Sequence, residues 1–303
     1  MSELVHLHGS ATPSTERRPA WLRVKVSRTD TFAEVGDLLR GLHLNTVCRE
    51  ARCPNIWECW GEHRTATLMI LGDICTRACR YCSVTKGRPA PVDADEPANV
   101  ALAVEKLGLR HAVITSVDRD DLADFGAGHF ARTIAALRER APNCRIEILT
   151  PDFGGDAAAL SLVFAAQPDV FGHNTETVPR LFPHVRAKGD YQRSLQVLAR
   201  IDAHRRKGSA TLTTKSGLML GLGETENEVL AVMDDLRQVR CDVLTLGQYL
   251  NPTRRHAPIA RFYPPEDFSR LRKAGLAKGF LHVEAGPLVR SSYHAHEHVP
   301  PPR

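Results

Sequence analysis

Three cysteines lie within eight residues in the string GDICTRACRYCSV, which spans residues 72–84. They are Cys75, Cys79 and Cys82, spaced C-x3-C-x2-C, with no fourth cysteine close behind. A closed zinc site takes four protein ligands, and disulfides use an even number of thiols. Three thiolates can instead hold three irons of a [4Fe–4S] cluster and leave the fourth iron open to a small molecule. The spacing therefore predicts a cluster with one open coordination position.

Two other interpretations of this first cysteine group stay open from the residues alone. A distant side chain could complete a zinc site, or the thiols could be unrelated, although chance rarely places three cysteines so close together. Arg77 and Arg80 lie between the cysteines. We expect their guanidinium charges to favour the thiolate forms that bind metals.

A second cysteine group precedes the first, in the string CREARCPNIWECW at residues 48–60. Cys48, Cys53 and Cys59 follow a C-x4-C-x5-C spacing. Two groups of three in one chain indicate two clusters. By spacing alone, a small zinc-bound flap over the main domain is the alternative for this second group.

Short β-rich runs alternate with amphipathic segments through the middle of the chain. In the segments 96–109, 129–141 and 226–239, apolar residues recur at three- and four-residue steps, as in a helix packed on a sheet. Strands that are apolar almost throughout and alternate with helices imply a parallel sheet covered on both faces. The expected strands are 67–71, 111–117, 145–150, 169–174, 213–220 and 242–250.

This alternation predicts an α/β fold, as a full or partial (β/α) barrel of about six parallel strands with N- and C-terminal extensions. A doubly wound open sheet is the competing layout, because strand order is not visible in the sequence. Polar strings follow each predicted strand, so we expect the site at the carboxyl ends of the strands. The expected divisions are a flexible arm (1–18), an extension with the second cysteine group (19–64), the barrel (65–285) and a C-terminal segment (286–303).

The first cysteine group resembles the signature of the radical S-adenosylmethionine enzymes, which carry C-x3-C-x2-C in the loop after the first barrel strand. Tyr81 fits the aromatic residue usually found just before the third cysteine of that signature. The resemblance implies that S-adenosylmethionine chelates the open iron of a [4Fe–4S] cluster through its amino and carboxylate groups. It also implies cleavage of the sulfonium to a 5′-deoxyadenosyl radical, which removes hydrogen from an unactivated carbon.

The second group, C-x4-C-P-N-x-x-E-C-W, closely resembles the auxiliary-cluster motif of the lipoyl synthases. The string RSSYHA (290–295) resembles the segment in which that family supplies a serine as fourth ligand, here Ser292. The strings HNTETVPRLFPHVR, YQRSL, KSGLMLGLGET and AGPLVRSSYHA are also similar, so the match runs from about Trp21 to Ala295. This resemblance implies a second [4Fe–4S] cluster that is consumed as the sulfur source. A hard serine oxygen among soft thiolates retains its iron less firmly, as such a cluster requires.

The resemblance further implies a sulfurtransferase that inserts two sulfurs at C6 and C8 of a protein-bound octanoyl-lysine. The implied partners are octanoylated lipoyl-domain carriers (2-oxoacid dehydrogenase E2 or glycine cleavage H protein), a reduced ferredoxin or flavodoxin, and an iron–sulfur carrier for cluster repair. Other radical sulfur-inserting enzymes, a two-cluster electron carrier and a zinc-stabilised scaffold are the rival hypotheses.

Four further residues are candidates for cofactor binding. Asn174 and Glu176 follow the fourth predicted strand, where they could hydrogen-bond the ribose and amino group of S-adenosylmethionine. Arg193 and Lys215 lie in strings that match the family, and a basic group could hold the methionine carboxylate. Glu224 lies in another such string.

Several other polar residues are read as structural. Asp118, Asp120 and Asp121 are expected to cap the following helix or to bind through its first turn, with a metal cluster as the alternative. The histidines of the tail are expected to be solvated, with metal binding as the alternative; they are His294, His296 and His298. Cys144 and Cys241 are expected to be buried free thiols.

Composition limits the classes of partner. The formal net charge of +5 is mild and spread out, which gives no argument for a nucleic-acid partner. No apolar run reaches membrane-spanning length, and residues 1–20 lack the apolar core of a signal peptide. We therefore expect a cytoplasmic protein, and in a reducing cytosol eight cysteines are more naturally metal ligands or catalytic thiols than disulfides.

Overall fold

The computed structural model describes residues 18–26, 29–206, 208 and 212–298. The predicted flexible arm at residues 1–18 lies outside the described residues except for Arg18, and so does the tail beyond His298. In the described part, no helix combines the length and apolar character needed to cross a bilayer.

One sheet of eight strands forms the centre of the molecule, in the order β1-β2-β5-β6-β7-β8-β9-β10. All neighbouring pairs are parallel except β1 and β2, which are antiparallel. A separate parallel pair, β3 and β4, lies in the loop of the first cysteine group. The strands are β1 (Asn45–Thr46), β2 (Thr67–Ile70), β3 (Ile74–Cys75), β4 (Thr85–Lys86), β5 (His111–Ser116), β6 (Arg145–Leu149), β7 (Val170–Gly172), β8 (Thr213–Leu220), β9 (Val243–Gln248) and β10 (His282–Gly286).

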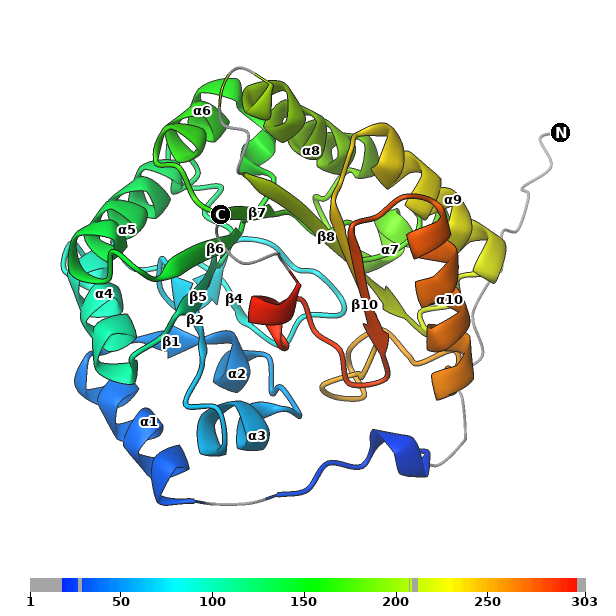
Figure 1. Cartoon of the computed structure of the whole chain (residues 1–303), viewed down its shortest axis with the longest axis horizontal. Coiled ribbons are helices and arrows are strands. Elements are labelled where there is room, and N and C mark those ends of the chain that lie inside the picture. Colours follow the sequence, from blue (N-terminus) through cyan, green and yellow to red (C-terminus); the bar gives the residue numbers. More distant parts are fainter. Residues whose placement is uncertain (1–17, 27–28, 207, 209–211, 299–303) are drawn as a thin grey trace, which may run out of the picture.

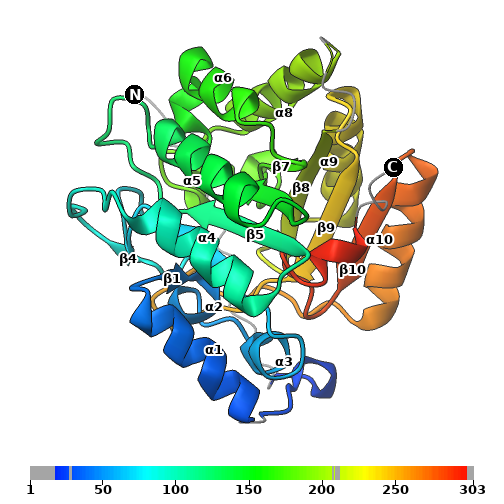
Figure 2. The ribbon, with the colours of Figure 1, turned by 60° about the vertical axis from the view of Figure 1, so that its left-hand side comes forward.

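Helices form an outer arc around this sheet, and α1 to α3 lie beside the β1 edge (Figures 1 and 2). The α-helices are α1 (Asp30–Gly41), α2 (Val47–Glu50), α3 (Ile56–Gly61), α4 (Glu96–Leu107), α5 (Ala127–Arg140), α6 (Ala157–Ala165), α7 (Phe182–Val185), α8 (Tyr191–Arg205), α9 (Glu226–Gln238) and α10 (Pro265–Ala277). Four 3-10 turns complete the described elements: η1 (Ala20–Leu22), η2 (Phe153–Gly155), η3 (Pro179–Leu181) and η4 (Ala295–Glu297).

The strand order decides between the two predicted layouts. Each parallel strand pairs with the next parallel strand along the chain, which is the order of a barrel and not of a doubly wound sheet. Strands β1 and β10 are the two edges and are not paired with each other in the described part of the chain. The fold is therefore a partial (β/α) barrel.

The six predicted strands and three predicted helices are all present, with shorter bounds in most cases. The count of about six parallel strands was too low by one, because β10 at His282–Gly286 follows the last predicted strand. This strand has only one fully buried residue, so it lacks the continuous apolar run of the others.

Local sequence explains where the main helices begin and end. At the start of α9, Thr225 and Glu228 form a capping box, which satisfies backbone N–H groups that the helix itself leaves unpaired. Helix α4 ends at Gly108, whose left-handed backbone (φ 65°) is accessible to glycine at little cost. These caps fix where the helices begin and end, and therefore which residues form the loops between helices and strands.

The N-terminal extension packs on the barrel through apolar contacts. Phe32 of α1 stacks on Trp57 of α3 at a ring-centroid distance of 4.8 Å. Trp60 is fully buried, and it belongs to the same apolar core as Leu68 and Ile70 of β2. Helix α3, which carries Cys59, is therefore fixed against the first barrel strand.

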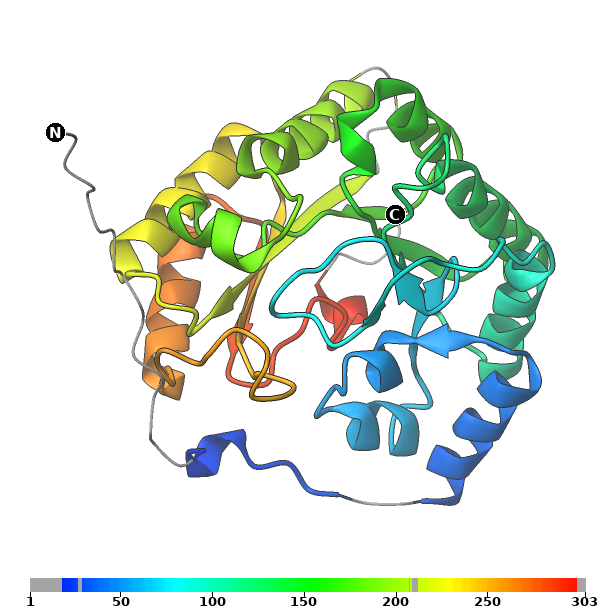
Figure 3. The same cartoon turned by 180° about the vertical axis from the view of Figure 1, so that it is seen from behind.

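The C-terminal segment returns across the barrel after β10. At Gly247 of β9, a Cβ atom would come within 2.0 Å of the Val289 carbonyl oxygen, so the crossing requires glycine there. The turn η4 lies within the ring of strands in Figure 1, whereas the cysteine loop lies in front in the view from behind (Figure 3).

The prediction that the tail histidines are solvated holds only for His296. His298 is buried and stacks on His282 at 5.1 Å, and His294 is partly buried against α3. The prediction failed because the segment packs on the molecule up to His298, although its sequence has few large apolar residues. Cys144 and Cys241 are buried free thiols, as predicted.

Candidate active site

A cavity of about 450 Å³ opens at the carboxyl ends of the strands and is bordered by members of both cysteine groups. The first group contributes all three of its cysteines, and the second contributes Cys48 and Cys53. Ser291 and Ser292 of the C-terminal segment also line it. Residues from positions 48 to 292 therefore meet around one space, as the predicted site at the strand ends requires.

The first cysteine group is held by the backbone of its own loop. Strands β3 and β4 close the loop, and the Gly87 N–H donates to the Cys75 carbonyl at 3.1 Å. The Cys75 sulfur accepts two backbone N–H groups at 3.4 Å, from Arg77 and Asp118. The Arg80 N–H donates to the Val185 carbonyl oxygen at 2.8 Å, which fixes the other side of the loop.

The electrostatic environment of these thiols differs from the expectation. Burial raises the pKa of Cys79 to about 12 and that of Cys82 to about 11, and neighbouring thiols add to the effect. Burial and the Asp118 carboxylate raise the pKa of Cys75. The predicted stabilisation of thiolates by Arg77 and Arg80 is therefore outweighed, and a bound metal has to displace the thiol protons.

Arg77 instead forms a buried ion-pair network beneath the loop. Its guanidinium lies 2.7 Å from Asp152, 2.8 Å from Asp120 and 3.2 Å from Asp118. The prediction that Asp118, Asp120 and Asp121 cap the next helix is wrong, because α5 begins only at Ala127. Asp121 pairs with Arg119 of the same string at 2.9 Å, whereas Asp118 and Asp120 pair with Arg77 of the cysteine loop.

The second cysteine group gathers beside Ser292. Burial raises the pKa values of the Cys48 and Cys59 thiols, and neighbouring thiols add to the effect, Cys53 on Cys48 and both Cys48 and Cys53 on Cys59. The backbone of Thr67 hydrogen-bonds the Cys48 thiol, and its hydroxyl donates to the Ser292 oxygen at 2.6 Å. Three soft sulfurs and one oxygen thus converge, and this donor set fits a [4Fe–4S] cluster with a serine ligand.

Asn174 and Glu176 line the cavity on the side of β8. The Asn174 amide donates to the Ser291 hydroxyl at 2.8 Å and to Glu176 at 3.2 Å. Its carbonyl oxygen is buried without a hydrogen-bond partner among the described residues. Since a buried acceptor without a partner is costly, the site fits a ligand that donates a hydrogen bond there. Burial raises the pKa of Glu176.

Two predicted cofactor contacts lie away from the cavity. The Lys215 ammonium is buried 2.6 Å from Glu147, in an ion pair inside the barrel. Arg193 lies 3.2 Å from Asp152, behind the cysteine loop. Neither lines the cavity. Glu224 accepts two backbone N–H groups of its own loop, from Gly221 and Leu222, and supports that turn.

Arg186 is a cavity residue that sequence reasoning missed. It is buried, lines the cavity, and donates to the backbone carbonyl oxygen of Asn174 at 2.6 Å, which is distinct from the unpartnered side-chain Oδ1 atom. It acts electrostatically on Cys79, Tyr81 and Glu176. Arg186 is the last residue of the family-like string HNTETVPRLFPHVR, so a signal was present, but Arg193 and Lys215 in other such strings were chosen instead. Ser291 was also missed, because the motif RSSYHA was used to assign only its neighbour Ser292.

Comparisons with known proteins find relatives over nearly the whole chain. The profile of the Radical SAM superfamily matches residues 69–236, and that of the N-terminal domain of lipoyl synthase matches residues 6–53. The lipoyl synthase of Rubrobacter xylanophilus is 55% identical over 92% of this chain and 86% of its own length. The lipoyl synthase of Chloroflexus aurantiacus is 51% identical over 99% of this chain and 98% of its own.

Solved structures support the fold. Streptococcus suis SuiB bound to precursor peptide SuiA superposes with a TM-score of 0.55 at 12% identity, covering 84% of this chain and 60% of its own. Methylornithine synthase (PylB) superposes with a TM-score of 0.50 at 13% identity, covering 88% and 85%. At these identities the likeness concerns the barrel alone.

Proposed function

Because this chain belongs to the lipoyl synthase family of the radical S-adenosylmethionine superfamily, we propose that its two cysteine groups divide one reaction between radical generation and sulfur donation. The enzyme is a sulfurtransferase that inserts two sulfurs at C6 and C8 of a protein-bound octanoyl-lysine and so forms the lipoyl cofactor. An iron–sulfur cluster and S-adenosylmethionine are its cofactors.

Each cysteine group is assigned one cluster. Cys75, Cys79 and Cys82 hold the first and leave an open iron for S-adenosylmethionine. The second is held by Cys48, Cys53, Cys59 and Ser292. When bound, the first cluster with S-adenosylmethionine supplies a 5′-deoxyadenosyl radical, and the second supplies sulfur.

The cavity residues orient the cofactor. The unpartnered Asn174 Oδ1 atom accepts a hydrogen bond from it, and the Glu176 carboxylate, which accepts from the Asn174 amide nitrogen, is a second acceptor in the cavity. Arg186 holds its carboxylate through charge-assisted hydrogen bonds. The buried position of Arg186 in the cavity favours it over Arg193 and Lys215, which were the earlier candidates and which are each engaged by a carboxylate elsewhere.

Apolar side chains on the cavity wall provide space for an alkyl chain. They include Met69, Val117, Leu218, Met219 and Leu250. A wall of this kind excludes water from the reacting carbons, which protects a primary radical from side reactions. The octanoyl chain therefore lies between the two cysteine groups, with hydrogen abstraction on one side and the sulfur source on the other.

The proposal extends to partners and compartment. The octanoyl group arrives on a lipoyl-domain carrier, either a 2-oxoacid dehydrogenase E2 or the glycine cleavage H protein. A reduced ferredoxin or flavodoxin supplies electrons, and an iron–sulfur carrier rebuilds the consumed cluster. We place the protein in the cytoplasm, since ligation by free cysteines requires reduced thiols.

The observation that carries this proposal is the meeting of both cysteine groups and Ser292 around one cavity. The test uses anaerobically reconstituted protein, S-adenosylmethionine, a strong reductant and an octanoyl-lysyl peptide, with mass spectrometry of peptide and 5′-deoxyadenosine. We expect about eight irons per chain from two four-iron clusters, and a peptide that carries two new sulfurs. Deoxyadenosine without sulfur on the peptide would contradict the assigned sulfur donor or substrate.

A further inference from the structure

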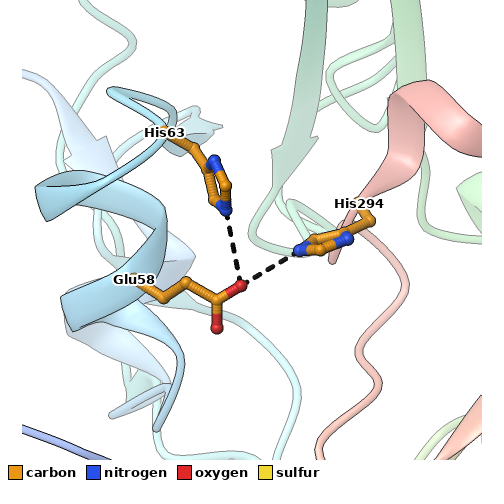
Figure 4. A group of neighbouring side chains, drawn as sticks. All are labelled: Glu58, His63 and His294. Atoms are coloured by element: carbon orange, nitrogen blue, oxygen red, sulfur yellow. Dashed lines mark hydrogen bonds and ion pairs between the residues drawn. The ribbon is translucent and has the colours of Figure 1, made fainter.

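A carboxylate of the N-terminal extension joins the two segments that carry the proposed ligands of the second cluster. We propose that Glu58 is a latch that positions Ser292, by holding the residues that follow this serine in the chain. Figure 4 shows Glu58 of α3 reaching His294 of the C-terminal segment, with His63 on its other side. The proposal rests on the proposed function, because it concerns the cluster assigned there to the second cysteine group.

The latch consists of Glu58, Tyr293 and His294. The Tyr293 hydroxyl donates to the Glu58 carboxylate, at 2.9 Å from one oxygen and 3.0 Å from the other. The His294 Nε2 atom lies 3.0 Å from the same carboxylate, and the two rings pack at a centroid distance of 4.2 Å. His63 adds a longer contact of 3.4 Å. One carboxylate thus collects three side chains from two distant parts of the chain.

The positions of these residues in the chain connect the latch to the ligands. Glu58 directly precedes Cys59, and Tyr293 directly follows Ser292. The Glu58–Tyr293 contact therefore joins residues directly adjacent to two proposed iron ligands, and His294 is one residue further along. Cys59 and Ser292 are 233 positions apart, so the chain itself does not fix the distance between them. The hydrogen bond between Glu58 and Tyr293 does fix the distance between the two backbones.

A second contact from the same motif supports the same segment before the serine. The Asn55 side-chain amide donates to the Leu288 carbonyl oxygen at 2.8 Å. The polar residues of the string CPNIWEC thus hold the C-terminal segment on both sides of Ser292. The Thr67 hydroxyl meanwhile holds the serine oxygen itself. Of these contacts, only the latch acts on the residue next to the serine.

The chemistry of the site gives the latch its purpose. Serine is the weakest member of this donor set, because its hard oxygen suits the iron of a sulfide cluster less well than a thiolate. A weak ligand stays in place only when its backbone is held close to the iron. Outer-sphere partners of this kind are typically worth a 10–100-fold change in metal affinity or activity.

The test measures iron retention in the full-length chain with Cys75, Cys79 and Cys82 replaced by alanine, so that only the second cluster forms. Glu58→Ala and Tyr293→Phe are compared with Glu62→Ala, an exposed glutamate one turn further along. After anaerobic reconstitution, a chelator is added, and iron release is followed together with the Mössbauer spectrum of the unique iron. We expect about 10–100-fold faster release from Glu58→Ala, a smaller change in the same direction from Tyr293→Phe, and parent behaviour from Glu62→Ala.

The possible outcomes distinguish failure of the latch from failure of the proposed second cluster. If the parent takes up four irons and Glu58→Ala releases iron as slowly as Glu62→Ala, the latch is overturned alone. If the parent takes up no iron, the second cluster and the latch are both overturned. Glu58→Gln can still accept a hydrogen bond from Tyr293, so partial rescue supports the latch, and release as fast as from Glu58→Ala contradicts it. Tyr293→Phe removes only the hydroxyl and keeps the ring packing on His294, so faster iron release from this variant cannot be attributed to misfolding.

Discussion

The two cysteine groups border one cavity but are built in opposite ways. The first lies in one loop between β2 and α4, and its thiols are positioned by backbone contacts within that loop and its neighbours. The second is assembled from the N-terminal extension and from Ser292, which follows the last strand. A local site depends on its loop, whereas an assembled site depends on how distant segments pack. The two sites should therefore fail separately.

Their electrostatic surroundings differ as well. Beneath the first group, Arg77 and three aspartates form a buried network, and Arg186 lies on the cavity side. Beside the second group, Arg290 lowers the pKa of Cys53 against the larger opposite effect of burial, and Glu58 raises that of Cys59. The first group thus lies on a buried ion-pair network, whereas a cation and a carboxylate each act on one cysteine of the second.

Substitution of one cysteine from each group gives the largest expected contrast. In Cys75→Ala, we expect 5′-deoxyadenosine formation to fall below detection while the second group keeps its iron. In Cys53→Ala, deoxyadenosine should still form, but the peptide should gain no sulfur. Iron analysis and mass spectrometry of both products test this pair. Loss of both activities in both variants would show that the sites do not fail separately.

Arg77→Ala should damage the local site alone. It leaves Asp152 fully buried without its main cation, and breaking a buried pair in this way costs about 3–5 kcal/mol. We expect a lower unfolding midpoint in urea and weaker S-adenosylmethionine cleavage, with iron of the second group retained in the fraction that stays folded. Arg88→Ala, a substitution of an exposed arginine further along the same loop, is the matched control. Equal iron loss from both groups would contradict the distinction.

Ser292→Cys should act only on the assembled site. A fourth thiolate would hold its iron more firmly than the serine oxygen does. We expect sulfur insertion to slow by about tenfold, or about 1.4 kcal/mol in barrier, with deoxyadenosine formation unchanged. Ser291→Ala should instead affect S-adenosylmethionine binding, because Ser291 contacts Asn174. Faster sulfur transfer in Ser292→Cys would refute the role given to the weak ligand.

The smallest expected effect is a change in stability with pH that comes from His173, a fully buried residue of the barrel that belongs to neither cysteine group. Its Nδ1–H donates to the Thr150 carbonyl at 2.9 Å, and burial lowers its pKa to about 3. Since the unfolded value is about 6.5, the unfolded chain binds more protons between these two values, so stability is lost as the pH falls below neutrality. The loss between pH 7 and pH 6 is about 0.7 kcal/mol.

The variant His173→Asn keeps the donor to Thr150 but removes the titrating ring. Urea midpoints of parent and variant under argon at pH 7 and pH 6 measure the difference. The parent should lose more stability than the variant, and iron retention should change equally in both cysteine groups. An identical pH response in parent and variant would show that His173 does not titrate as inferred.

What the sequence could predict follows the same division between local and assembled features. The strands, the helices and the first cysteine loop depend on periodicity and short spacing, so they were predicted within a few residues. Ser292 was assigned as a ligand only through resemblance, and its role stays a prediction, since nothing in its own neighbourhood of the sequence marks it as a ligand. The position of Arg186 in the cavity and the ion pairs of Lys215 and Arg193 depend on which charged side chains meet in the folded barrel. That meeting cannot be read from the sequence around each residue. His298 was misread because burial was decided by packing across the barrel.

The crossing of the C-terminal segment over β9 also affects the order in which the two cysteine groups can be completed during synthesis. The ribosome makes both cysteine groups before the barrel helices, but it makes Ser292 only after β10, the last strand of the sheet. A nascent chain can fold and load its first loop while the fourth ligand of the second group does not yet exist. Under the proposed ligand assignment, the second cluster would be supplied after the barrel is finished, and the order of synthesis would set the order of maturation.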